Sequence, residues 1–167
     1  DGALGQIVCV SYAIDDNEPV VIYASEWKDS EQFILTSLYE NLQTSYSPNS
    51  QVRPVFIGHN IVSFDLRFLL QRSIIVGVKP PMFIPFKAKP WDDVVFDTMT
   101  AWAGVGNRVS MAKLCEVFKI DAKGSEVDGE IDGSKVWDYV QAGRIDDVAT
   151  YCVHDVIRTR QIYKRIN

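Results

Sequence analysis

Two short segments each place a carboxylate beside side chains that could bind a ligand. In the first, an apolar stretch ends in a Gly-His-Asn turn at residues 58–60, and Phe64 and Asp65 follow at the start of a predicted helix. Open α/β sheets bind ligands where strands end, so an amide, an aromatic ring and an acid at this point predict a binding site. The structural alternative is that Asp65 only complements the positive helix end, with Phe64 packed in the core.

The second segment lies in the longest predicted helix. Tyr151 and Asp155 are four residues apart, so their side chains lie on one face of that helix. They are expected at the edge of its apolar stripe, which consists of Val148, Cys152, Val156 and Thr159. A tyrosine and an acid at the edge of a core can face a cleft together. The alternative is a purely structural hydrogen bond from the tyrosine hydroxyl.

The elements that must position these segments follow from the apolar pattern. Runs rich in β-branched residues predict strands in four segments: residues 5–14, 19–25, 54–60 and 93–99. The first two flank an acidic turn and predict a hairpin, and the third is expected to be buried. Helical spacing predicts helices in five segments: residues 30–42, 63–77, 110–120, 135–143 and 146–166. Polar or glycine- and proline-rich sequence predicts loops in three: residues 44–54, 79–90 and 121–134.

Helix ends are predicted from single residues. We expect Ser110, and either Asp29 or Ser30, to cap helices at their N-termini. Gly77 and Gly143 are expected to end helices.

The length and the order of the elements indicate the fold class. The chain has 167 residues, of which 47% are hydrophobic and 23% charged, as is typical of a folded domain with its own core. Strands come first, strands and helices then alternate, and helices close the chain. This order predicts one α/β domain over residues 1–167, with a mixed β-sheet flanked by helices on both faces.

The net charge and the positions of the cysteines limit the classes of function that the protein can have. A formal net charge of −5 argues against a protein that coats duplex DNA through charge alone. It is compatible with an enzyme that acts on nucleic acid, because carboxylates that bind divalent cations raise the negative count. Cys9, Cys115 and Cys152 lie in apolar stretches without a CxxC pair, which predicts reduced, buried thiols in a cytoplasmic protein.

Taken in this order, the two segments resemble the second and third motifs of the DEDD superfamily of 3′–5′ exonucleases. N-x-x-x-F-D-x-x-F-L, from Asn60 to Leu69, resembles the second motif, and Y-x-x-x-D, from Tyr151 to Asp155, resembles the tyrosine form of the third. Nearly the whole chain is similar to stand-alone bacterial or phage exonucleases related to the proofreading domain of family-B DNA polymerases. The resemblance implies a ribonuclease H-like fold and hydrolysis of phosphodiester bonds from the 3′ end of single-stranded DNA.

The resemblance also implies roles for individual side chains. Asp65 and Asp155 would bind Mg²⁺ or Mn²⁺, two ions in the complete site, since hard cations prefer carboxylate oxygen. Tyr151 would position the attacking water, because a phenol with a pKa of about 10 in water is a weak base. Three residues would contact the terminal nucleotide: His59, Asn60 and Phe64. Completing the turn remains the alternative for Asn60, and core packing for Phe64.

The first motif of the family, an Asp-x-Glu at the end of the first strand, is not found in a matching position. Three such sequences occur, each with a local explanation: Asp16–Glu18 in the hairpin turn, Asp29–Glu31 as caps at a helix start, and Asp128–Glu130 in a glycine-rich loop. The family has three strands before its first helix, and two are predicted here. We therefore expect the first strand to be missing from this polypeptide, which predicts weak metal binding and reduced or absent activity.

Other features keep a structural interpretation beside a functional one. Asp97, which ends a predicted strand, either takes part in the candidate site or only forms a local hydrogen bond. The three lysines of residues 79–90 either guide a nucleic-acid backbone or are simply solvated. We expect packing within the core or between parts of the domain for three tryptophans: Trp91, Trp102 and Trp137. We expect the cations of the last helix to be solvated: Arg158, Arg160, Lys164 and Arg165.

Two other functions remain open. One is a catalytically inactive ribonuclease H-like module that binds nucleic acid or a protein partner. The other is an exonuclease of the oligoribonuclease type, which trims RNA.

Overall fold

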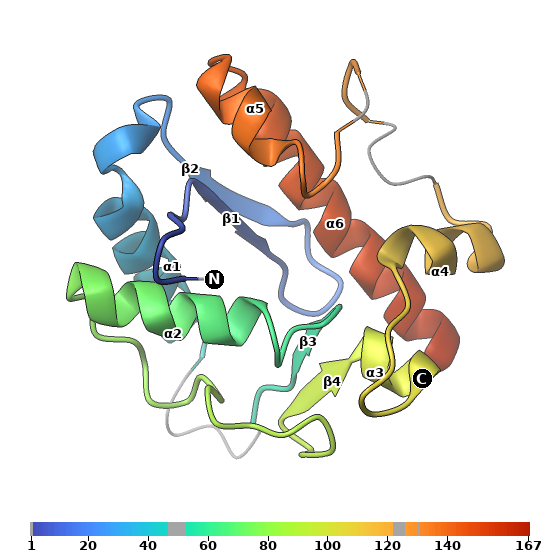
Figure 1. Cartoon of the computed structure of the whole chain (residues 1–167). Coiled ribbons are helices and arrows are strands. Elements are labelled where there is room, and N and C mark those ends of the chain that lie inside the picture. Colours follow the sequence, from blue (N-terminus) through green and yellow to red (C-terminus); the bar gives the residue numbers. More distant parts are fainter. Residues whose placement is uncertain (1, 47–52, 122–125, 130) are drawn as a thin grey trace.

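A computed structural model gives the fold of four stretches of the chain: residues 2–46, 53–121, 126–129 and 131–167 (Figure 1). The loops predicted at residues 44–54 and 121–134 therefore lie partly outside the described residues. Within these stretches, helices and small sheets form the mixed α/β arrangement that the sequence predicts. No helix among them is both long enough and apolar enough to cross a membrane.

The described strands pair as two separate two-stranded sheets, and not as the single mixed sheet that the sequence predicts. β1 (Cys9–Tyr12) pairs antiparallel with β2 (Val20–Tyr23), which confirms the predicted hairpin. β3 (Phe56–Gly58) pairs in parallel with β4 (Val95–Asp97). Within the described residues, each strand is thus hydrogen-bonded to another strand along one edge only.

The described helices include the five that the sequence predicts. In chain order, all the described helices are η1 (Trp27–Asp29), α1 (Glu31–Ser45), α2 (Asp65–Val76), α3 (Thr98–Ala103), α4 (Met111–Phe118), α5 (Val136–Gln141) and α6 (Ile145–Ile166). The 3-10 turn η1 and the helix α3 were not predicted. Both are too short for an apolar stripe to reveal them.

The hairpin lies between two layers of helices (Figure 1). Successive residues of a strand point to opposite faces of its sheet. Val10 and Ile22, which lie opposite each other, pack in the cluster that includes α1 and α2. Cys9 and Tyr23, the next opposite pair, pack in the cluster that includes α5 and α6.

Helix α6 contacts more of the fold than its own layer. It packs against β1 and β2 in one sheet and against β3 in the other. It also contacts α3, α4 and α5, and Ile162 joins it to a third apolar cluster with Met111, Leu114 and Cys115 of α4. The two sheets are therefore held against the same helix.

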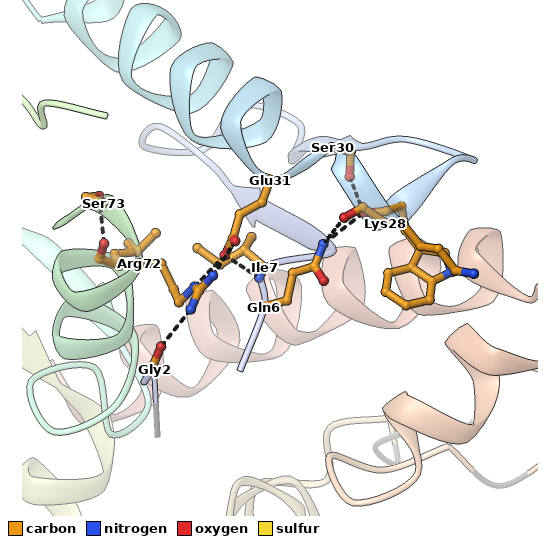
Figure 2. A network of polar contacts seen from close by, with 10 residues as sticks. Gly2, Gln6, Ile7, Lys28, Ser30, Glu31, Arg72 and Ser73 are labelled. Carbon is orange, nitrogen blue, oxygen red and sulfur yellow. Dashed lines mark hydrogen bonds and ion pairs between the residues drawn. The ribbon is translucent and has the colours of Figure 1, made fainter. Parts of the chain in front are cut away.

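A buried ion pair joins α1 to α2 (Figure 2). Arg72 donates from Nε and Nη2 to the two carboxylate oxygens of Glu31, at 2.7 and 2.6 Å. The same carboxylate accepts from the N–H of Ile7 at 2.8 Å, and Arg72 Nη1 donates to the carbonyl of Gly2 at 3.0 Å. Only 11% of the Arg72 side chain and 9% of the Glu31 side chain are exposed. Glu31 is therefore not a simple helix-end acid, because it ties residues 2–7 to both helices.

Most predicted helix ends are confirmed. Gly77 adopts the left-handed conformation after α2, with φ of 78°, and Gly143 has φ of 75° before α6. Ser110 caps α4 by accepting from the N–H of Lys113. The expected side-chain cap of α1 is wrong. Ser30 lies at the cap position, but its hydroxyl donates backwards to the carbonyl of Trp27.

Several predicted core positions are exposed. Ile57 in β3 is exposed, because this strand has a described partner on one edge only. The side chains of Trp91, Trp102 and Trp137 are also exposed, so packing in the core is wrong for all three. Trp102 contacts Phe118 edge-to-face, and Trp137 contacts Trp27 in the same way, so two of these rings join short helices at the surface.

Replacing Arg72 with leucine should strongly destabilise the fold. The Glu31 carboxylate would then be buried without its cation, and breaking a buried pair in this way costs about 3–5 kcal/mol. Equilibrium unfolding in urea measures the loss. The double variant Glu31→Leu/Arg72→Leu should be more stable than the single variant, because both buried charges are gone.

Lys113→Ala is the matched control. It removes the exposed pair between Lys113 and Glu116 and should cost less than about 1 kcal/mol. An Arg72→Leu variant as stable as this control would contradict the role of the buried pair.

Candidate active site

The chain turns sharply between β3 and α2, and this turn places Asp65. Asn60 has a positive φ of 63°, a conformation in which asparagine is enriched among non-glycine residues. Its N–H donates to Asp97 Oδ1 at 2.9 Å, which fixes the turn to the end of β4. Asp65 is then the first residue of α2, and it is exposed.

Asp97 has a structural role. It is buried, and Oδ1 also accepts from the N–H groups of Met99 and Thr100 at 3.0 and 3.4 Å. These bonds cap α3. Of the two interpretations of Asp97, the local hydrogen-bonding role is therefore the one that the geometry supports.

His59 is bonded within the protein through both ring nitrogens. Nε2 lies 3.0 Å from the carbonyl of Val109, which can only accept, and Nδ1 lies 3.0 Å from Thr98 Oγ1. The ring thus links β3 to α3 and to the segment before α4. Contact between His59 and a substrate stays a prediction, and it would require one of these bonds to be exchanged.

Phe64 is a surface residue. Its side chain is 53% exposed, and its ring stacks on Phe68 with centroids 5.8 Å apart. Core packing, the structural alternative for Phe64, is therefore wrong. An exposed aromatic ring stands directly before Asp65.

Tyr151 and Asp155 lie close to each other on α6, at different depths. Tyr151 is 6% exposed and packs in the cluster that contains Val148, so it lies inside the core and not at its edge. The Asp155 side chain is 27% exposed. The Tyr151 hydroxyl oxygen and Asp155 Oδ1 are nevertheless both shielded from solvent.

The buried face of α6 differs from the predicted stripe. It consists of Ile145, Val148, Ala149, Tyr151, Arg158 and Ile162. Cys152 and Val156, expected at its centre, are only half-buried. The buried face is rotated relative to the predicted one because the helix packs against both sheets and against α3, α4 and α5. These tertiary contacts cannot be predicted from the apolar periodicity of the helix alone.

Arg158 corrects the expectation of a solvated cation at this position. It is 2% exposed and donates to the Glu126 carboxylate from Nη1 and Nη2, at 3.1 and 2.5 Å. Nε donates to the carbonyl of Asp121, and Nη1 lies 3.8 Å from Asp155 Oδ1. The guanidinium therefore places a buried positive charge next to one of the candidate acids. Sequence analysis missed it because Glu126 lies in a segment predicted as a loop.

Two further cations of α6 bind the hairpin turn. Arg160 donates to the carbonyl of Asn17, and Lys164 pairs with Asp16.

The structure places the two motifs on elements that meet at β3. Asp65 follows β3 through the turn at Asn60, and α6, which carries Tyr151 and Asp155, packs against β3. Direct approach of the Asp65 and Asp155 carboxylates stays a prediction.

The described residues do not by themselves form a metal centre. Among them, no three acidic, histidine or cysteine side chains come together in a way that could hold a metal ion. Two of the Asp-x-Glu sequences use an acid in an ion pair, Asp16 with Lys164 and Glu31 with Arg72. Glu130 of the third lies outside the described residues. Asp65 and Asp155 alone do not make up a two-metal centre.

Comparison with known protein families gives a match over nearly the whole chain. A family described as a predicted 3′-5′ exonuclease related to the exonuclease domain of PolB matches residues 3–167. The chain belongs to this exonuclease family. Membership supports an exonuclease at the level of enzyme class, and both candidate motifs lie inside the matched range. Comparison with curated proteins and with solved structures finds no significant match.

Glu126→Gln should remove an acid-sensitive part of the stability. Burial opposes ionisation of Glu126, but the hydrogen bonds and charge of Arg158 outweigh it and hold the pKa of this carboxyl below its ordinary value of 4.5. A carboxyl with a lowered folded-state pKa stabilises the fold above its unfolded-state pKa, and this contribution is lost as the pH falls through the folded-state value. We expect the variant to be less stable at neutral pH, and its stability to fall less steeply below about pH 4.5.

Thermal unfolding across pH 3–7 is the measurement, and Glu116→Gln, the same change at an exposed side chain, is the control. Identical pH profiles for Glu126→Gln and the unaltered protein would show that the pair with Arg158 does not form.

Proposed function

We propose that the protein is a 3′–5′ exonuclease that hydrolyses single-stranded DNA, with Asp65, Tyr151 and Asp155 in its catalytic site. The observation that carries this proposal is family membership over residues 3–167, which gives the reaction class. The placement of Tyr151 and Asp155 on the helix that contacts both sheets supports the site.

Tyr151 has the properties of a residue that orients water. Its ring is fixed in an apolar cluster, and its hydroxyl lies one helical turn from Asp155 and away from bulk solvent. A phenol with a pKa of about 10 in water remains protonated at neutral pH. The hydroxyl is therefore suited to hydrogen-bond a water molecule and hold its direction, without serving as the base.

We assign Asp65 and Asp155 as ligands of Mg²⁺ or Mn²⁺, because hard divalent cations bind carboxylate oxygen. The further ligands of a two-metal site would come from an additional strand that joins β1–β2 and β3–β4 into one ribonuclease H-like sheet. Two observations support this arrangement. Each described strand is paired along one edge, and α6 packs against both sheets.

The surface beside Asp65 suits a single strand. Phe64 offers an exposed ring, on which a base can stack whatever its identity. A base inside a duplex is already stacked, whereas the terminal base of a single strand is free to reach this ring. The exposed side chains of Lys79, Lys87 and Lys89 supply positive charge in an otherwise acidic protein, and they would contact the phosphates.

A second candidate is a catalytically inactive module that binds nucleic acid or a protein partner. The observation that favours it is the lack of a complete acidic cluster among the described residues. Binding without cleavage would then use Phe64 and the lysines and leave Asp155 without a catalytic role.

Release of label from a 3′-labelled DNA single strand, in the presence of Mg²⁺ or Mn²⁺, tests the proposal. Asp155→Ala should slow release by at least about 100-fold, because it removes a carboxylate that binds metal. Tyr151→Phe keeps the ring and removes the hydroxyl. It should lower kcat by roughly 10- to 100-fold with little change in KM, since water is oriented after the substrate has bound.

Glu116→Ala, at an exposed acid on α4, is the control and should be fully active. Equal release by the unaltered protein and Asp155→Ala would reject the site. A 3′ label retained by both proteins, with the DNA still bound, would support the inactive module if the polypeptide also carries the additional strand, because that strand supplies the remaining metal ligands of the proposed site. Faster release from an RNA strand of the same sequence would replace DNA with RNA as the substrate.

A further inference from the structure

Cys9 and Cys152 lie on two elements that pack against each other. Cys9 is in β1, and its side chain is on the α6 face of the hairpin, as is that of Tyr23 directly opposite. Cys152 is in α6, immediately after Tyr151. Contact between β1 and α6 therefore brings together two cysteines from the two ends of the described chain.

Cys152 lies one helical turn after Val148, whose side chain packs in the same cluster as Cys9, so both cysteines lie at the interface between β1 and α6. They are close enough to share a hydrogen bond, and neither is in a disulfide. Both residues are half-buried, whereas Cys115 is buried in the separate cluster between α4 and α6. The fold thus selects one of three cysteine pairs.

We propose that Cys9 and Cys152 are a modification site, at which a peroxide converts the two thiols into a reversible disulfide. The disulfide itself does not depend on the proposed function. Its effect on catalysis does, because Cys152 lies between Tyr151 and Asp155 on the same turn of α6.

The reaction balances with hydrogen peroxide as the oxidant. The hydrogen bond with Cys152, and secondly burial, raise the pKa of the Cys9 thiol well above its ordinary value, so Cys9 keeps its proton. The Cys152 sulfur loses its proton as it attacks a peroxide oxygen, the O–O bond breaks, and the sulfenic acid forms while the released hydroxide takes up that proton as water. The Cys9 thiol then attacks this sulfur, the S–S bond forms as the S–O bond breaks, and the hydroxyl group leaves as water with the Cys9 proton. Two thiols lose two electrons, and one peroxide becomes two water molecules.

The disulfide would fix β1 to the turn of α6 that carries the candidate catalytic groups. A bond between residues so far apart in sequence restricts the unfolded chain strongly, and the model of chain entropy predicts a large stabilising effect. We expect the melting temperature of the oxidised protein to rise by about 5 °C or more. Drawing the two sulfurs to bonding distance would also displace the turn of α6 that carries Tyr151 and Asp155 from the position that packing gives it.

Pairing selectivity tests the proposal on the full chain. The protein is treated with hydrogen peroxide, remaining thiols are blocked with N-ethylmaleimide, and peptides are identified by mass spectrometry. In native buffer, the Cys9–Cys152 disulfide should be the main product, and dithiothreitol should reverse it. In denaturant, Cys115–Cys152 should dominate, because these two cysteines are the closest in sequence and close the smallest loop.

Two variants complete the design. Cys115→Ser should leave the native disulfide unchanged, and Cys152→Ser should abolish it. The proposal is overturned if folded and denatured proteins give the same distribution of pairs. It is also overturned if Cys9 and Cys152 both remain open to N-ethylmaleimide after oxidation.

The catalytic consequence is measured separately. In the Cys115→Ser protein, release of 3′ label should fall by at least about tenfold on oxidation and recover with dithiothreitol. Unchanged release in a protein shown to carry the disulfide would reject the effect on catalysis but leave the modification site standing. A protein that forms the disulfide and releases no label in either state would count against the proposed function alone.

Discussion

The packing of α6 against both small sheets joins two parts of the fold that, in the described residues, share no strand. Isolated two-stranded sheets are at best marginally stable in water, so neither would persist without a partner. Val148 and Tyr151 provide that partner on the hairpin side, and Ile162 anchors the far end of the helix against α4. A change in the tilt of α6 would therefore disturb every layer at once.

The helix that holds the fold together also carries the candidate chemistry. Tyr151 contributes its ring to the core and its hydroxyl to the site, so its position is set by packing before any substrate arrives. Arg158, one turn further on, brings a buried cation within 3.8 Å of Asp155. The charge of this carboxylate is thus partly balanced inside the protein, and its orientation is coupled to the ion pair with Glu126. Sites supported in this way by a regular element are held more accurately than sites on loops.

Local sequence signals predicted local structure well. The hairpin, Gly77 and Ser110 were all predicted, because a turn, a left-handed helix end and a cap each depend on a few adjacent residues. Local sequence signals gave wrong predictions where the burial or pairing of a side chain depends on a residue far away in the sequence. Arg158 is buried by a carboxylate 32 residues away, and Glu31 is paired with an arginine 41 residues away. The candidate site follows the same division. Its two motifs could be identified in the sequence itself, whereas the burial of the Tyr151 side chain depends on how α6 packs.

The order of elements along the chain also affects how the protein can be made. Ribosomes release the hairpin, α1 and α2 early, and α6 is the last element of the described chain to emerge. Until then, the hairpin face that bears Cys9 and Tyr23 lacks the apolar side chains that α6 adds to its cluster. A nascent chain would thus expose apolar surface on the hairpin until α6 docks, and this part of the fold would resist proteases only after that. Chaperones that hold extended apolar segments would act in this interval.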